Sequence, residues 1–156
     1  MGKAGYTSPA AAGVALIAAT AKSVIGVSAP AQFGVDLTKF RIAFDGATST
    51  AVPVSVELCA ATFATNPPGT ASTTITPVQV YGRSITAGFT AASNWTTEPT
   101  ALTVIDAWTL PAYGGTVVYD FPFSTSPDSP VSNGFVIRCT APAAVNARPT
   151  LWFERC

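Results

Sequence analysis

Hydrophobic and polar residues alternate with a period of two along much of the chain, most clearly near its C-terminal end. Residues 135–140 and 150–154 each place every second side chain on one face of an extended strand. We expect the inward-facing residues of these two runs to be Phe135, Ile137, Cys139, Leu151 and Phe153. The alternation predicts two half-buried strands that join a larger sheet.

The same pattern recurs upstream and predicts an all-β fold. In the run 36–45, for example, Phe40, Ile42 and Phe44 are expected to face inward, and Asp45-Gly46 is typical of a turn. The runs 102–110 and 116–123, separated by a Gly-Gly pair, predict a hairpin. Further strands are predicted at 22–29, 51–63 and 78–85. Together these runs indicate about eight short strands in a single-domain antiparallel β-sandwich, with long loops that favour a jelly roll over an immunoglobulin topology.

The N-terminal segment breaks this pattern. Residues 1–9 are polar and contain Gly, Ser and Pro, whereas residues 10–21 are rich in alanine and predict a short helix or the lead into a strand. We therefore expect residues 1–21 to form an extended arm or short helix, and residues 22–156 to form the sandwich domain. The apolar part is too short for a transmembrane helix, and its polar interruption at 6–9 argues against a secretory signal.

Two long polar loops are predicted at 64–77 and 88–99, and loops of this length are often functional. Together with the arm they suggest which residues contact a partner. The candidate partner-contact residues are Tyr6 and Pro9 in the arm, Asn66, Pro67 and Pro68 in the first loop, and Trp95 in the second.

The amino-acid composition indicates that other proteins cover much of the surface of this domain. Only 10% of the residues are charged and the mean hydropathy is +0.38, so the exposed faces are poorly protected against association. The eight basic and eight acidic residues cancel and are scattered singly. We therefore expect protein partners, and neither nucleic acid nor membrane.

Catalytic chemistry has few candidate residues in this sequence. The absence of histidine excludes triads that use an imidazole base and metal sites that need imidazole. Asp106 and Asp120, near the ends of the predicted hairpin, are the best candidates for a carboxylate pair. Cys59, Cys139 and Cys156 form no metal pattern, and a bridge from Cys156 to either of the others stays open. We expect no enzymatic activity, no cofactor and no metal.

The C-terminal run GFVIRCTAPAAVNARPTLWFE, with the preceding SPDSPVSNG, resembles the closing segment of small β-sandwich virion proteins of tailed bacteriophages. FGVDLTKFRIAFDG and VPVSVELCAATF are similar to the same group. The resemblance implies a capsid decoration or cement protein that is bound to the outer surface of the virion. Its implied partners are the major capsid protein and further copies of itself, with a trimer favoured. The resemblance brings no catalytic residues.

Two alternatives remain open. The first is a tail, baseplate or fibre component of a phage virion. The second is a carbohydrate-binding module, which would gather Trp95, Trp108, Trp152 and Tyr113 into a stacking platform on one exposed face.

Overall fold

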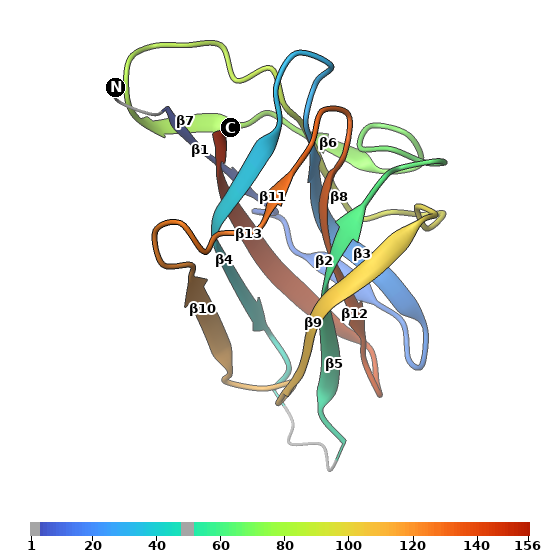
Figure 1. Ribbon diagram of the computed structural model, residues 1–156. Helices are drawn as coiled ribbons and strands as arrows, with labels where there is room; N and C mark the ends of the chain where they lie inside the picture. Colours follow the sequence, from blue (N-terminus) through green and yellow to red (C-terminus); the bar gives the residue numbers. More distant parts are fainter. Residues whose placement is uncertain (1–3, 48–51) are drawn as a thin grey trace.

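The chain folds into a β-sandwich of two antiparallel sheets (Figure 1). The computed structural model describes residues 4–47 and 52–156, and in these ranges it contains 13 strands and no helix. Accordingly, none of the described residues belongs to a helix that could cross a membrane.

One sheet has seven strands, and its central path runs β10-β4-β13-β1-β7. Two short strands join this path at its side, because β11 pairs with β4 and β2 pairs with β13. The bounds are β1 (Gly5–Pro9), β2 (Val14–Leu16), β4 (Val35–Phe44), β7 (Val78–Tyr81), β10 (Thr116–Asp120), β11 (Asp128–Ser129) and β13 (Val145–Arg155).

The other sheet has six strands in the order β6-β8-β3-β12-β5-β9. The bounds are β3 (Ala21–Ser28), β5 (Val54–Ala61), β6 (Thr73–Ile75), β8 (Thr90–Ser93), β9 (Leu102–Leu110) and β12 (Gly134–Thr140). The order of strands matches that of the first sheet, because β5, β12, β3 and β8 follow one another as β4, β13, β1 and β7 do. The Phe40 ring of β4 stacks on Trp108 of β9 across the sandwich, and β10 pairs with β4, so β9 and β10 are edge strands on the same side.

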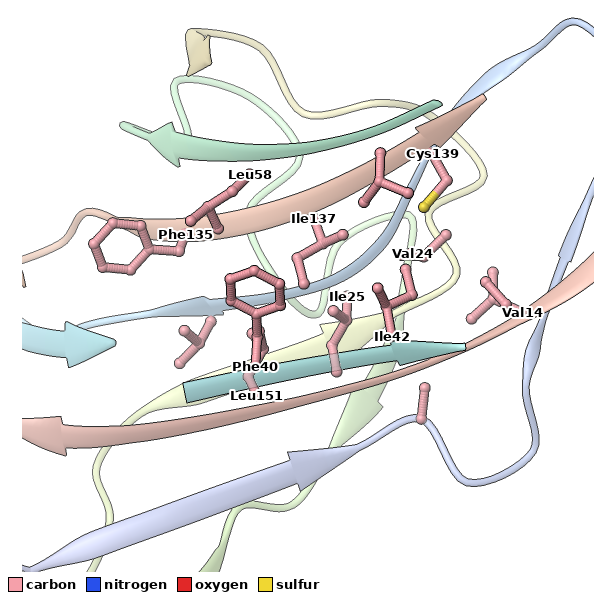
Figure 2. Packing of buried hydrophobic residues seen from close by; sticks show 14 of the residues in the cluster. Val14, Val24, Ile25, Phe40, Ile42, Leu58, Phe135, Ile137, Cys139 and Leu151 are labelled. Atoms are coloured by element: carbon pink, nitrogen blue, oxygen red, sulfur yellow. The ribbon is translucent and has the colours of Figure 1, made fainter. Parts of the chain in front are cut away.

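The main core lies between the two sheets (Figure 2). The predicted inward-facing residues of β4, β12 and β13 are all buried there, which confirms the two-residue alternation: Phe40, Ile42, Phe44, Phe135, Ile137, Cys139, Leu151 and Phe153. Val136, on the opposite face of β12, is also buried, in a smaller cluster that contains Phe63 and Trp95. The strand β12 is therefore covered on both faces.

The prediction that residues 1–21 form an extended arm or a short helix is wrong for residues 4–21, the part that the structure describes. The strand β1 lies inside the seven-stranded sheet, paired with β13 on one side and β7 on the other, and β2 pairs with β13. Tyr6 anchors β1 because its ring packs against Phe89 and Phe153 and its hydroxyl donates a hydrogen bond of 2.8 Å to the Ile85 carbonyl. Residues 1–3 of the predicted arm lie outside the described residues.

Two further expectations need correction. The strand count exceeds the predicted number partly because short strands form inside both predicted loops, β6 in 64–77 and β8 in 88–99. The predicted hairpin of β9 and β10 does not form, although β9 has the predicted bounds. Instead β9 pairs with β5 and β10 pairs with β4, so the connection formed by residues 111–115 crosses between the sheets (Figure 1).

Candidate contact surface

The edge strands β9 and β10 leave much of both faces exposed. In β9 the adjacent residues Val104 and Ile105 are 45% and 48% exposed, and in β10 Val118 and Tyr119 are 50% and 45% exposed. Adjacent apolar residues in a strand are typical of burial on both faces. The described residues, 4–47 and 52–156, do not supply that cover, so these two edges together form a candidate contact surface, which we call the open side.

Aromatic rings join the two edges of the open side to the core. The Phe40 ring stacks on Trp108 of the opposite sheet, with centroids 5.3 Å apart, and on Tyr119 of the neighbouring strand, at 5.7 Å. Phe121 lies 5.9 Å from Phe40 and 4.7 Å from Tyr119. Because Phe40 itself is fully buried, this cluster fixes the positions of β9 and β10 relative to each other.

Polar features interrupt the edges without covering them. The register between β5 and β9 skips Ile105, which gives β9 a bulge, and Asp106 accepts a hydrogen bond of 2.9 Å from the Ala107 amide. At the end of β10, Asp120 forms an ion pair with Lys39 at 3.4 Å. Bulges and charges limit uncontrolled pairing of edge strands. The open side is thus guarded against indiscriminate aggregation while its apolar side chains stay accessible.

The predicted carboxylate pair has no support in this geometry. Asp106 and Asp120 belong to strands of different sheets that do not pair, and each has the local partner described above. A different acidic group lines a surface cavity of about 550 Å³ beside Phe123, namely Asp36, Asp128 and Glu154. No cluster of His, Cys, Asp and Glu in residues 4–47 and 52–156 has the arrangement of a metal site.

Three of the six predicted partner-contact residues are buried within the chain itself. Tyr6 is 2% exposed and Trp95 only 1%, and Pro68 is also buried. The Trp95 indole donates a hydrogen bond of 2.9 Å to the Asn66 carbonyl, and the Asn66 side chain donates one of 3.1 Å to the Glu98 carbonyl. The two predicted loops therefore pack against each other.

The other three residues remain candidates. Pro9 and Pro67 are exposed, and Asn66 is partly exposed. A partner role for these three stays a prediction. Pro9 ends β1, and the other two lie in the connection between β5 and β6.

The tryptophans do not form a shared stacking platform. Trp95 is buried on the outer face of the six-stranded sheet, and Trp108 packs at the open side against Phe40. Trp152 lies on the outer face of the seven-stranded sheet, with the Lys39 ammonium 5.1 Å and the Arg41 guanidinium 5.7 Å from its ring centroid. This distribution gives the carbohydrate-binding alternative no geometric support.

None of the three cysteines forms a disulfide, so neither of the two bridges left open by the sequence is present. Burial raises the pKa of the Cys139 thiol far above its ordinary value, and burial is also the main cause of the raised pKa of Cys59. Both thiols therefore stay protonated at neutral pH and behave as small core residues.

Comparison of the chain with protein-family models, with curated proteins and with solved structures found no match.

Proposed function

We propose that this chain is a structural protein of a virion, and specifically a bacteriophage capsid decoration protein that binds the outer shell and stabilises it. The observation that carries the proposal is the open side, where Val104, Ile105, Val118 and Tyr119 remain exposed on two edge strands. The proposal assigns the chain no catalytic role.

An exposed apolar edge strand is unfavourable in water unless another protein covers it. Edge strands present unpaired backbone N–H and C=O groups, and natural proteins normally cover or charge them. Here Asp106 and Asp120 are the only charged residues of β9 and β10, so apolar contact with another protein is the favourable way to cover the surface. A chain with 10% charged residues is suited to burial against neighbours.

The proposal also includes the topology of the sandwich. We assign the sandwich to the jelly-roll type, which occurs in viral shell proteins. Support comes from the pairs β4/β5, β13/β12, β1/β3 and β7/β8, which follow one another in the same order in both sheets. The partners we propose are the major capsid protein and further copies of this chain, with a trimer favoured.

Co-sedimentation with empty shells tests this proposal. Shells assembled from the major capsid protein encoded with this chain would be mixed with the wild type and with Ile105→Lys and Val118→Lys. We expect the wild type to pellet with shells and each variant to bind about tenfold more weakly or worse, because a buried lysine costs desolvation. Ile17→Lys is the matched control, since Ile17 is 67% exposed and lies outside the open side.

The thermal unfolding midpoints of all three variants should stay close to that of the wild type, because each substituted side chain is exposed. A wild-type chain that ignores shells would contradict the proposal, and so would open-side variants that bind as well as Ile17→Lys. Binding to purified tails instead of shells would favour the tail-component alternative.

A further inference from the structure

We propose that Arg41 and Arg148 form a binding pocket for a carboxylate group on the outer face of the seven-stranded sheet. The two side chains line a surface cavity of about 260 Å³ at the end of β1. The remaining lining is apolar or neutral and consists of Pro9, Ala10, Ala11, Pro149 and Thr150.

The strand register places the two arginines on one face. Arg41 in β4 is directly opposite Thr150 in β13, and Arg148 is opposite Ala43. The arginines are therefore diagonal neighbours across adjacent strands, a separation of roughly 7–8 Å between Cα atoms that long side chains bridge easily. Both are exposed, so a ligand can approach from solvent.

Other contacts hold each guanidinium in position. Arg148 donates a hydrogen bond of 3.2 Å from Nη1 to the Ala11 carbonyl, and Arg41 lies over the Trp152 ring at 5.7 Å. A planar guanidinium that is already oriented loses less conformational freedom when it binds a ligand. The pocket is in this sense preorganised.

The positive charge of the pocket is only partly balanced, because Arg148 has the carboxylate of Asp45 nearby, whose pKa is lowered by hydrogen bonds from Asn146 and also by the arginine. Within residues 4–47 and 52–156, neither arginine forms an ion pair, whereas the nearby Lys39 is paired with Asp120. Asp45, the acidic group closest in sequence, binds the amide and side chain of Asn146 at 3.0 Å each. Two like charges held together beside one carboxylate, which already accepts two hydrogen bonds from Asn146, leave a net positive charge that favours binding of an anion.

A carboxylate fits this site better than a larger ligand. Guanidinium groups bind carboxylates through two parallel hydrogen bonds, and the cavity is smaller than the roughly 300–1,000 Å³ of typical small-molecule sites. Two sources share this chemistry: an Asp or Glu side chain of a neighbouring protein, and an acidic sugar. The pocket does not depend on the proposed function, although Pro9 is one of the residues predicted from sequence to contact a partner.

Nuclear magnetic resonance titration of the whole chain tests the pocket without shells. The Nε–Hε signals of the arginines would be followed while N-acetylglutamate, N-acetylneuraminic acid or the neutral N-acetylglutamine is added at constant ionic strength. We expect saturable shifts at Arg41 and Arg148 with one or both acids, none with the neutral amide, and little change at Arg83. The acid that binds more tightly identifies the source, and equal binding supports a pocket that recognises the carboxylate alone.

Substitution of the arginines distinguishes specific binding in the pocket from nonspecific attraction of anions to positive charge. Arg41→Gln and Arg148→Gln should each weaken binding by about tenfold, whereas Arg83→Gln, which removes the same charge after β7, should not. Shifts that fail to saturate, that appear equally with N-acetylglutamine, or that persist in both pocket variants would overturn the proposal. Because shells are absent from this experiment, its failure is distinguishable from a failure of the decoration hypothesis.

Discussion

At the scale of single residues, Gly134 shows how closely β12 approaches β3. A Cβ atom at this position would overlap the Val27 carbonyl and lie 2.9 Å from the Ser28 Cα, both of them backbone atoms that cannot turn away. We predict that Gly134→Ala lowers the free energy of unfolding by about 2–3 kcal/mol, because the central strands must separate to admit the methyl group.

Urea denaturation measures this change, and Gly114→Ala provides the control. Gly114 has a φ of +64°, and apart from its chain neighbours no residue comes within 4 Å of the added methyl, so its substitution carries only the backbone cost of about 1 kcal/mol. Equal losses in the two variants would show that the close approach of β12 and β3 is not limiting.

Thiol reactivity is a second prediction at this scale. Cys59 and Cys139 are fully buried with raised pKa values, whereas Cys156 is exposed. Because the thiolate is the reactive form, we expect one thiol per chain to react with a disulfide reagent at pH 8 in the folded state, and three in denaturant. Rapid reaction of more than one thiol in the native chain would mean that the core opens readily.

At the scale of elements, β1 is a strand on which the stability of the seven-stranded sheet depends. We predict that a chain without residues 1–9 loses cooperative unfolding, because its removal leaves β13 and β7 without their shared neighbour and removes the buried Tyr6. Circular dichroism during urea denaturation would detect this loss. A truncated chain with the wild-type midpoint would restore the arm interpretation.

Two substitutions of Tyr6 should lower the free energy of unfolding by different amounts, which the same urea denaturation measures. Tyr6→Ala should lower the free energy of unfolding by about 3–5 kcal/mol, as expected when a large aromatic side chain is removed from a core. Tyr6→Phe removes only the hydrogen bond to the Ile85 carbonyl and should cost about 1 kcal/mol.

The elements that the sequence predicted correctly are those with an unambiguous alternation. The inward faces of β4, β12 and β13 follow directly from Phe40, Phe135 and Leu151 with their second neighbours. By contrast, β1 contains Gly5 and Pro9, which are typical of loops and arms, so only its pairing with β13 makes it a strand.

The candidate sites were harder to predict because tertiary contacts decide them. Trp95 occurs in a loop-like sequence, and it is buried among Phe63 and Val136, which lie far from it along the chain. The open side could have been suspected from the adjacent pairs Val104-Ile105 and Val117-Val118, but their exposure depends on which strands cover them. Arg41 and Arg148 are likewise remote in sequence and meet only through the register of β4 with β13.

At the scale of the whole molecule, the central strands of each sheet should be better protected from hydrogen exchange than its edge strands. We predict that the amides of β12 and β13 exchange hydrogen most slowly, because each strand is paired on both sides near the middle of its sheet. The amides of β9 and β10 that point away from β5 and β4 should exchange at least about a hundredfold faster.

Hydrogen exchange with mass-spectrometric detection checks this order, and repeating it with bound shells connects it to function. Binding at the open side should slow exchange in β9 and β10 and leave β6 unchanged. Protection that appears only outside β9 and β10 would place the contact elsewhere on the molecule.

The pairing of β1 with β13 has a consequence for the chain as it is synthesised. Gly5 is held opposite Glu154, so the first strand finds one of its two neighbours only after residue 155 has left the ribosome. Until then β1 and β4 both lack the strand that lies between them, and their apolar faces stay unprotected. The seven-stranded sheet therefore cannot close before β13 has been synthesised, and the exposed faces make the nascent chain a client for chaperones during that interval.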